Sequence, residues 1–298
     1  MTDTVGVIGL GIMGGAMSAN LVDGDFRVSG YDVDPTASER LAAKGGEIAT
    51  SPGAVAQQAG IIITSLPSPA ALDDVVNGED GLISAGKRGA VVIETSTLTI
   101  ADKQRAHDAL AAAGITMLDC PLSGTGAQAI TKDLLVYASG DHAAFERCVP
   151  VLDGFARGHH YVGEFGNGSK MKYVANLLVA IHNVASGEAM VLGMKAGLDP
   201  QVIYDVIADG AGGSRIFQLR GPMMVADNYE PATMRMEIWQ KDMKVIGEFA
   251  SALKSPTPLF AASAEVYKAG MAQGRAKQDT ASVCGVLEEI GRFERGKI

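Results

Sequence analysis

An apolar run that leads directly into three closely spaced glycines constrains the fold of this chain more than any other feature. Residues 5–9 predict a short parallel strand buried on both faces. The strand runs into Gly9-Leu10-Gly11-Ile12-Met13-Gly14, after which apolar residues recur at helical spacing. In this spacing Gly9 allows a tight turn, Gly11 lets the backbone approach a pyrophosphate, and Gly14 permits close helix–sheet packing. We therefore expect a dinucleotide-binding loop, with a glycine turn that binds no ligand as the alternative.

An acidic residue near the end of the next predicted strand supports a dinucleotide site. Asp32 lies 21 positions after Gly11 (32 − 11), close to the spacing of about 20 expected for a carboxylate that binds a ribose hydroxyl. No arginine occurs in Asp32-Val33-Asp34-Pro35, so a 2′-phosphate would meet carboxylates instead of a cation. The sequence therefore predicts NAD as the cofactor in preference to NADP. The alternative is that Asp32 is an ordinary carboxylate at a strand end.

The distribution of predicted elements divides the chain into two domains. Apolar strands alternate with alanine-rich helices in the first half; the strands are expected at residues 5–9, 26–32, 60–65, 90–94, 115–119 and 134–139. In the second half only long helices are expected, at residues 169–196, 200–209, 216–227, 241–253 and 258–272. This pattern predicts an α/β protein with a doubly wound parallel sheet of the Rossmann type at residues 1–163. An all-helical domain is expected at residues 164–298.

Composition excludes several classes of protein. The chain has 298 residues with 25 Lys+Arg and 34 Asp+Glu, and a net charge of −9 argues against sequence-independent binding to nucleic acid. No apolar run reaches the roughly 18 residues of a membrane-spanning helix, and the N-terminus has no secretory signal. Three cysteines without CxxC spacing predict reduced, mostly buried thiols and a cytoplasmic location. The five histidines show no metal-ligand spacing, so no metal site is expected.

A second cluster of polar residues follows the strand expected at residues 115–119. The sequence Asp119-Cys120-Pro121-Leu122-Ser123-Gly124-Thr125-Gly126 therefore falls at the carboxyl edge of the sheet, where ligands bind in open α/β folds. Ser123 and Thr125 provide hydroxyls, and the glycine-rich backbone provides N–H groups that suit a carboxylate. The alternative is a surface turn without a ligand.

A polar stripe occurs on the first helix of the second half. Lys172, Asn176 and Asn183 share one helical face at about 100° per residue. The apolar neighbours, which include Val174 and Leu178, predict that this helix is largely buried, and buried polar groups need partners or a function. The alternative is a solvated lysine on an exposed face, which fits the neighbouring Lys170.

These three segments together resemble the β-hydroxyacid dehydrogenases, the relatives of 3-hydroxyisobutyrate, tartronate semialdehyde and 6-phosphogluconate dehydrogenases. Residues 9–14 match the cofactor signature of that family, residues 119–124 its substrate motif, and residues 166–176 its catalytic helix. Leu66-Pro67, Ser96-Thr97 and Lys241-Asp242 also match family positions that contact the cofactor. In two departures, Thr125 stands where a second glycine is usual, and Ala175 stands where the first of two asparagines is usual. In the second half, residues 188–198, 202–207 and 211–214 look most like the L-threonate dehydrogenase branch.

The resemblance implies a role for each candidate residue. Lys172 would transfer the proton as base in oxidation and acid in reduction, which requires its pKa to fall by about 2–3 units from 10.4, or roughly 3–4 kcal/mol. Asn176 would hold the reacting oxygen, while Ser123, Gly124 and Thr125 would bind the substrate carboxylate. Lys241, Leu66, Pro67 and Thr97 would contact the cofactor together with the glycine loop. An exposed cation at the start of a helix is the alternative for Lys241.

The resemblance leaves the substrate and direction open. The leading prediction is NAD-dependent oxidation of a short 3-hydroxy acid or sugar acid of the threonate or 3-hydroxyisobutyrate type. The alternatives are a reductase of small aldehyde acids, such as succinic or tartronate semialdehyde or glyoxylate, and a dinucleotide-sensing protein without catalysis. Because Lys172 is present, the more distant imine reductases are disfavoured. Family members are commonly homodimers or homotetramers, and the same is expected here.

Overall fold

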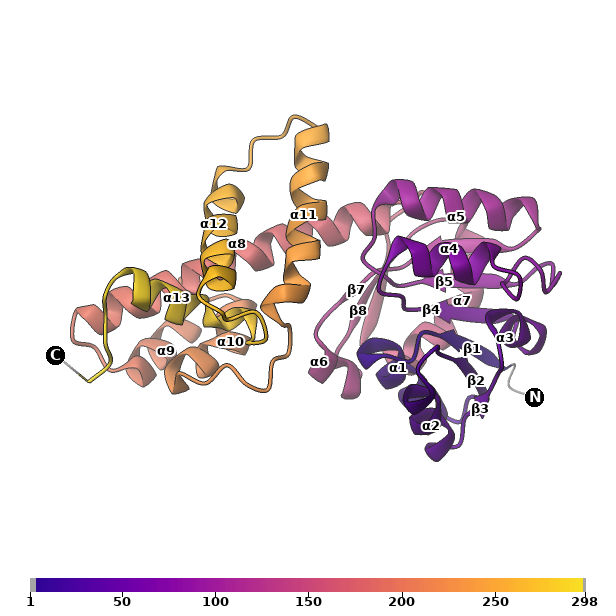
Figure 1. Ribbon diagram of the computed structural model, residues 1–298, viewed down its shortest axis with the longest axis horizontal. Helices are drawn as coiled ribbons and strands as arrows, with labels where there is room; N and C mark the ends of the chain where they lie inside the picture. The colour runs from indigo at the N-terminus through magenta and orange to yellow at the C-terminus, as the bar shows by residue number, and fades with distance from the viewer. Residues whose placement is uncertain (1–3, 297–298) are drawn as a thin grey trace. The chain divides into compact units, whose positions relative to one another are not determined.

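The structure is a computed structural model that describes residues 4–296. The chain forms two compact units, Met1–Lys172 and Tyr173–Ile298. In the part of the chain that the structure describes, all strands belong to the first unit, and the second contains only helices (Figure 1). This arrangement confirms the predicted fold class. The domain limit at residues 163 and 164 stays a prediction, since a functional domain need not end where a compact unit ends.

A six-stranded parallel sheet forms the centre of the N-terminal unit. Its strand order is β3-β2-β1-β4-β5-β6. The strands are β1 (Val5–Ile8), β2 (Val28–Tyr31), β3 (Glu47–Ile48), β4 (Ile61–Thr64), β5 (Val91–Glu94) and β6 (Thr116–Asp119). Val5 of β1 pairs with Val28 on one side and with Ile61 on the other. The direction of strand addition reverses between β1 and β4, so the loops after these strands diverge at the carboxyl edge and leave room for a ligand.

Helices cover both faces of this sheet (Figure 1). They are α1 (Ile12–Asp23), α2 (Pro35–Ala43), α3 (Pro52–Gln58), α4 (Pro69–Asn77), α5 (Ile100–Ala112) and α7 (His142–Phe155). Val7 and Ile63 belong to a buried core with residues of α1, α2 and α7, whereas Ile8 and Ile62 belong to a second core with residues of α3, α4 and α5. Successive strand residues thus point to opposite faces, as the period of two in a β-strand requires.

A separate three-stranded sheet corrects one expectation from the sequence. Residues 134–139 were predicted as another strand of the parallel sheet, but β8 (Leu135–Ala138) pairs antiparallel with β7 (Leu122–Ser123) and parallel with β9 (Gly158–Tyr161). The connection between β7 and β8 contains only the short helix α6 (Gly126–Ile130) and its turns. It is too short for the crossover that a parallel pair needs, so the chain returns in the antiparallel direction.

The second unit is built from helices joined by buried polar contacts. It comprises most of α8 (Asn167–Lys195) and all of α9 (Pro200–Ala208), α10 (Arg215–Ala226), α11 (Met236–Ala252), α12 (Pro258–Ala272), η1 (Thr280–Ser282) and α13 (Val283–Ile290). The fully buried Asp279 pairs with Arg220 at 3.3 Å and accepts hydrogen bonds from the backbone N–H groups of Met234 and Ala281. These contacts join α10 to the segments that precede α11 and α13.

Helix α8 corrects the expectation that no segment could span a membrane. By length and composition alone its 29 residues are apolar enough to do so. Its buried face nevertheless carries Asn183, whose side-chain amide donates to the Tyr267 hydroxyl at 3.0 Å and to the Thr280 carbonyl at 2.7 Å. The core helix of a protein that spans no membrane meets the same criterion of length and composition, so this helix alone is weak evidence for a membrane span.

Candidate active site

The three glycines of the loop after β1 have different structural roles. Gly9 has a φ of +87°, and a Cβ there would overlap the carbonyl oxygen of Ser65. A Cβ on Gly14 would overlap the carbonyl oxygen of Gly9. At Gly11, by contrast, a Cβ would meet no atom within 4 Å, and the residue is exposed. Two glycines are therefore needed to fold the loop, and the third leaves its backbone open to a large ligand.

The N-terminus of α1 is suited to an anion. Helices α2 to α7 each begin with a residue whose side chain accepts a hydrogen bond from a backbone N–H of the first turn. The N-cap residue of α1 is Gly11, which has no side chain to accept such a bond, and the first turn contains no acidic residue. The first-turn N–H groups and the positive end of the helix dipole therefore face outward without a side-chain acceptor, as in known pyrophosphate sites.

Asp32 lies directly after β2 and contacts the glycine loop. One carboxylate oxygen accepts a hydrogen bond from the Leu10 N–H at 2.6 Å, and the other accepts from the Asp34 N–H at 2.8 Å. Each oxygen has a second lone pair, so the carboxylate can still accept hydrogen bonds from a pair of ribose hydroxyls. The residues at this edge of the sheet thus fit a dinucleotide, with the pyrophosphate at α1 and the ribose at Asp32.

The turns after β4 and β5 meet at the same edge. The Leu66 N–H donates to the Ser96 hydroxyl at 2.8 Å, and Leu66 packs against the second core. Pro67 is exposed and Thr97 is half-buried. The structure therefore brings together the two pairs, Leu66-Pro67 and Ser96-Thr97, that were predicted to contact the cofactor.

The loop predicted to bind the substrate acid lies against the glycine loop. A Cβ on Gly126 would approach Cγ2 of Ile12 to 2.5 Å. The Asn20 side chain of α1 also donates to the Ala129 carbonyl of α6 at 2.7 Å, and this contact is buried. Ser123 and Gly124 are half-buried in this loop, and Gly124 has a φ of +141°. Two motifs more than 100 residues apart are thus neighbours.

Thr125 forms the capping box of α6. Its N–H donates to the Gln128 side-chain oxygen at 3.0 Å, and its hydroxyl accepts from the Gln128 N–H at 3.5 Å. The Gln128 amide in turn donates to the Asp133 carboxylate at 2.9 Å. The departure from glycine at position 125 therefore serves the fold of this loop. The cap uses the Thr125 hydroxyl as an acceptor, so its proton can be donated to a substrate carboxylate once it turns away from the Gln128 side-chain oxygen, which lies 3.4 Å away.

The first turn of α8 is fixed to the end of β6. Asp119 is fully buried and accepts hydrogen bonds from the Ser169 N–H at 2.7 Å and from the Ser169 hydroxyl at 2.8 Å. The Gly168 N–H donates to the Ser139 hydroxyl at 2.9 Å, and a Cβ on Gly168 would lie 2.5 Å from the Asp119 carbonyl oxygen. Lys172 follows Ser169 by three residues and is half-buried. The lysine therefore stands one helical turn beyond an anchored helix start.

The next polar residue of the stripe has a partner that the sequence analysis did not single out. The Asn176 side-chain amide donates to the Asp242 carboxylate of α11 at 3.0 Å, and both side chains are buried. Lys241 beside it is exposed. The only sequence signal for Asp242 was its position next to Lys241, because the contact depends on how α11 packs against α8.

The surroundings of Lys172 on α8 are less buried than predicted. Val174 is 54% exposed and Leu178 is 47% exposed. The buried side chains near it are Tyr173, Asn176, Ala180 and Asn183, which recur three or four residues apart. From Tyr173 onward one face of α8 packs against other helices of the second unit, and other positions carry exposed apolar side chains, so an apolar sequence does not imply burial on all sides.

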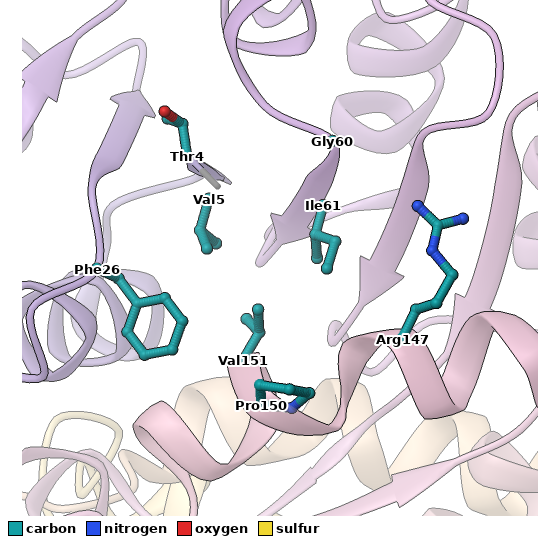
Figure 2. Close-up of a pocket in the computed structure, with 8 residues that line it drawn as sticks. All are labelled: Thr4, Val5, Phe26, Gly60, Ile61, Arg147, Pro150 and Val151. Carbon is teal, nitrogen blue, oxygen red and sulfur yellow. The ribbon is translucent and has the colours of Figure 1, made fainter. Parts of the chain in front are cut away.

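A pocket of about 400 Å³ lies at the opposite edge of the sheet (Figure 2). It opens at the amino ends of β1 and β4, beside Val5 and Ile61, and Phe26, Pro150 and Val151 give it an apolar wall. Arg147 is the one charged residue among the eight that line it. The pocket is separated from the glycine loop by the length of the strands and is not part of the candidate active site.

The fold and the loops at its carboxyl edge define an NAD(P)-binding oxidoreductase of the Rossmann type. Residues 4–163 match the NAD binding domain of 6-phosphogluconate dehydrogenase, and residues 166–287 match the NAD-binding domain of NADP-dependent 3-hydroxyisobutyrate dehydrogenase. The chain belongs to the β-hydroxyacid dehydrogenase family and is an NAD(P)-dependent hydroxy acid dehydrogenase. These matches confirm the predicted family, the enzyme class and a nicotinamide dinucleotide as cofactor, whereas NAD in preference to NADP stays a prediction.

Individual relatives cover nearly the whole chain. L-threonate dehydrogenase of Haemophilus influenzae is 32% identical over 98% of this chain and 98% of its own length. The chloroplastic glyoxylate/succinic semialdehyde reductase 2 of Arabidopsis thaliana is 29% identical over 96% of this chain and 80% of its own. The crystal structure of 3-hydroxyisobutyrate dehydrogenase from Salmonella typhimurium has a TM-score of 0.85, 31% identity, and coverage of 95% of this chain and 99% of that one.

Proposed function

We propose that the protein oxidises a short 3-hydroxy acid or sugar acid, of the threonate or 3-hydroxyisobutyrate type, with Lys172 as the proton-transfer residue. The observation that supports this most directly is the anchoring of the first turn of α8 by Asp119, at the same sheet edge as the glycine loop. An acid–base group must be held in a defined position relative to the reacting atoms, and an anchored helix start provides this.

The proposed roles divide between binding and proton transfer. A bound nicotinamide supplies the hydride acceptor during oxidation and the hydride donor during reduction. Lys172 Nζ takes the proton of the substrate hydroxyl in oxidation and returns it in reduction. The Asn176 amide, oriented by its bond to Asp242, donates to the same substrate oxygen through its second N–H. Ser123 and Gly124 hold the carboxylate, which directs the carbinol carbon towards the cofactor site.

The proposed cofactor is NAD. Asp32 supports this preference because its carboxylate lies at the end of β2 and would repel a 2′-phosphate. Asp34, the cap of α2, adds a second negative charge beside it. Leu10, Ile12 and Met13 contribute backbone groups of the glycine loop, and Leu66, Pro67, Thr97 and Lys241 are proposed as further contacts.

A second candidate is a reductase of small aldehyde acids. It is favoured by the 29% identity to a plant protein named glyoxylate/succinic semialdehyde reductase. The same residues would serve both directions, since Lys172 would then donate the proton. The absorbance of NADH at 340 nm measures turnover in both directions. Comparing a panel of hydroxy acids with NAD and a panel of aldehyde acids with NADH separates the two candidates. Tight NADH binding without turnover of any acid would instead indicate a dinucleotide sensor.

The decisive variant for the proposed chemistry is Lys172→Ala, with Lys170→Ala as the matched control. Lys170 is exposed and bonds to Asn167, so its loss should leave turnover unchanged. We expect Lys172→Ala to lower kcat by about 10²–10⁴-fold, the usual contribution of general acid–base catalysis, with NADH affinity nearly unchanged. Equal loss of turnover and NADH binding would show that Lys172 is structural.

We also propose a homodimer or homotetramer in the cytoplasm. Exposed apolar side chains on α8 and α9 support self-association, among them Leu192, Val202 and Val206. The three cysteines are buried and free of disulfides, which fits a reducing compartment. Light scattering coupled to size-exclusion chromatography tests the assembly, and a monomer at micromolar concentration would contradict it.

A further inference from the structure

Lys103 is buried in the N-terminal unit between two carboxylates. The Lys103 ammonium of α5 lies 2.6 Å from Glu94 Oε2 and 2.7 Å from Asp119 Oδ1. The side chains are 1%, 0% and 0% exposed. Burial by itself lowers the pKa of Lys103, but the charges of Asp119 and Glu94 outweigh it and raise the pKa above its ordinary value. The two ion pairs thus hold Lys103 in its charged form.

One of the two carboxylates holds the start of α8. Asp119 Oδ1, which pairs with Lys103, also accepts from the Ser169 hydroxyl at 2.8 Å. Its other oxygen accepts from the Ser169 N–H at 2.7 Å. The position of Ser169, and with it the helical turn that carries Lys172, depends on the orientation of this carboxylate.

The other carboxylate holds the turn after β4. Glu94 Oε1 accepts from the Ser96 N–H at 2.9 Å, and the Ser96 hydroxyl accepts from the Leu66 N–H at 2.8 Å. Leu66 is one of the proposed cofactor contacts. A continuous series of hydrogen bonds and ion pairs thus runs from Leu66 through Ser96, Glu94, Lys103 and Asp119 to Ser169, entirely within the first unit.

We propose that Lys103 is a positioning residue that fixes the cofactor turn at Leu66 and the catalytic end of α8 relative to each other. Without its positive charge, Glu94 and Asp119 would be two buried carboxylates in one site, and these must move apart or take up a proton. Movement of the two carboxylates alters the bonds to both Ser96 and Ser169, and protonation alters the bonds of the carboxyl that takes up the proton. The proposal rests on the proposed roles of Lys172 and Leu66.

The network predicts separate effects for its two arms. Ser169→Ala removes a bond on the α8 side, so we expect a lower kcat with unchanged NADH affinity. Ser96→Ala removes the acceptor of the Leu66 N–H, so we expect weaker NADH binding. Lys103→Met should show both effects, with kcat reduced by up to about 10²-fold, the cost of a misplaced reacting group. The exposed Lys44→Met is the matched control, since its pair with Asp23 lies on the surface.

The experiment combines NADH fluorescence titration, steady-state kinetics and hydrogen exchange of residues 167–172 in the protein without substrate. Faster exchange of this segment in Lys103→Met and Ser169→Ala, but not in Lys44→Met, is the expected result. In the Lys103→Met/Ser169→Ala double variant, the fold-decrease in kcat should be smaller than the product of the two single decreases, because both substitutions act through Asp119. If Lys103→Met does not fold, the two serine variants decide the question by the same measurements.

Two results would overturn the proposal. One is a folded Lys103→Met protein with wild-type kcat, NADH affinity and exchange; the other is the pair of serine variants with wild-type values in every measurement. A failure of the proposed chemistry gives a different result from a failure of the positioning role. If Lys172 does not transfer the proton, the Lys172→Ala protein retains turnover, and this result does not depend on the Lys103→Met measurements. A merely stabilising Lys103 would lower the melting temperature and leave kcat and exchange at 25 °C unchanged.

Discussion

Asp32 Oδ2 accepts a hydrogen bond from the Leu10 N–H at 2.6 Å, so the carboxylate proposed to bind the ribose also holds the glycine loop. The contact joins the end of β2 to the loop after β1, two adjacent strands of the sheet. The same side chain therefore shapes the pyrophosphate loop and sets the charge that a 2′-phosphate would meet.

Replacing Asp32 by Asn should change cofactor preference. We expect NADH binding to weaken by about tenfold, since hydrogen bonds to a charged group contribute about 1.5–3 kcal/mol. NADPH binding should weaken less or improve, because a negative charge is removed. Fluorescence titration with both cofactors measures the ratio, and the exposed Asp23→Asn is the control. An unchanged NADH to NADPH ratio would contradict the assignment of Asp32.

Two glycine substitutions should separate folding from cofactor binding. Gly14→Ala forces a methyl group into the Gly9 carbonyl and should destabilise the N-terminal unit by about 1–3 kcal/mol. Gly11→Ala meets no protein atom, so the melting temperature should stay near that of the wild type while NADH affinity falls. Gly60→Ala, which also meets no atom within 4 Å, is the control for both measurements. If Gly11→Ala binds NADH normally, the pyrophosphate does not approach that residue.

Exchanging the amide of Asn176 and the carboxylate of Asp242 tests the contact between α8 and α11. Asn176→Asp would place a second carboxylate beside Asp242, so we expect a loss of about 1–3 kcal/mol in the free energy of unfolding. The double variant Asn176→Asp with Asp242→Asn restores one acid and one amide and should recover part of that loss. Urea unfolding followed through Trp239, the one tryptophan of the chain, reports on this unit. Equal stability of the single variant and the wild type would be inconsistent with the bond.

Asp279 should contribute to the acid sensitivity of the second unit. Burial alone raises the pKa of Asp279, but Arg220 and the N–H and hydroxyl donors of Ala281, Thr233 and Met234 outweigh it and hold the pKa below its ordinary value. A carboxyl whose pKa is lower in the folded state than in the unfolded state stabilises the folded protein. This stabilisation is fully present at pH values above the unfolded pKa of about 3.9, and it is lost as the pH falls through the folded pKa.

Asp279→Asn should therefore lose stability at pH 7, by about 3–5 kcal/mol for a broken buried pair, and show a shallower further decline below pH 4. Urea unfolding between pH 7 and pH 2.5 measures both, with the exposed Asp205→Asn as control. If the free energy of unfolding falls with pH in parallel for the wild type and Asp279→Asn, Asp279 does not contribute to the acid sensitivity.

Local signals in the sequence were sufficient for most elements but not for all. The strand before Gly9 and the helix after it were predicted because their apolar spacing is regular. Strand β9 lies outside the expected strands because its residues, Gly158-His159-His160-Tyr161, carry little apolar signal. Helix α13 (Val283–Ile290) lies beyond the last expected helix, residues 258–272. The start of α11 at Met236 lies earlier than the predicted residue 241, because no side-chain cap marks it.

The sequence by itself determined the family, the α/β and helical division, and the candidate glycines, lysine and asparagine, because each of these depends on residues close together in the chain. Only the tertiary structure decided that Ser169 is held by Asp119, that Asn176 donates to Asp242, and that Lys103 lies between two carboxylates. These contacts join residues of different strands and helices. Their geometry follows from how the strands are ordered and how the helices pack, and no local pattern of residues contains that information.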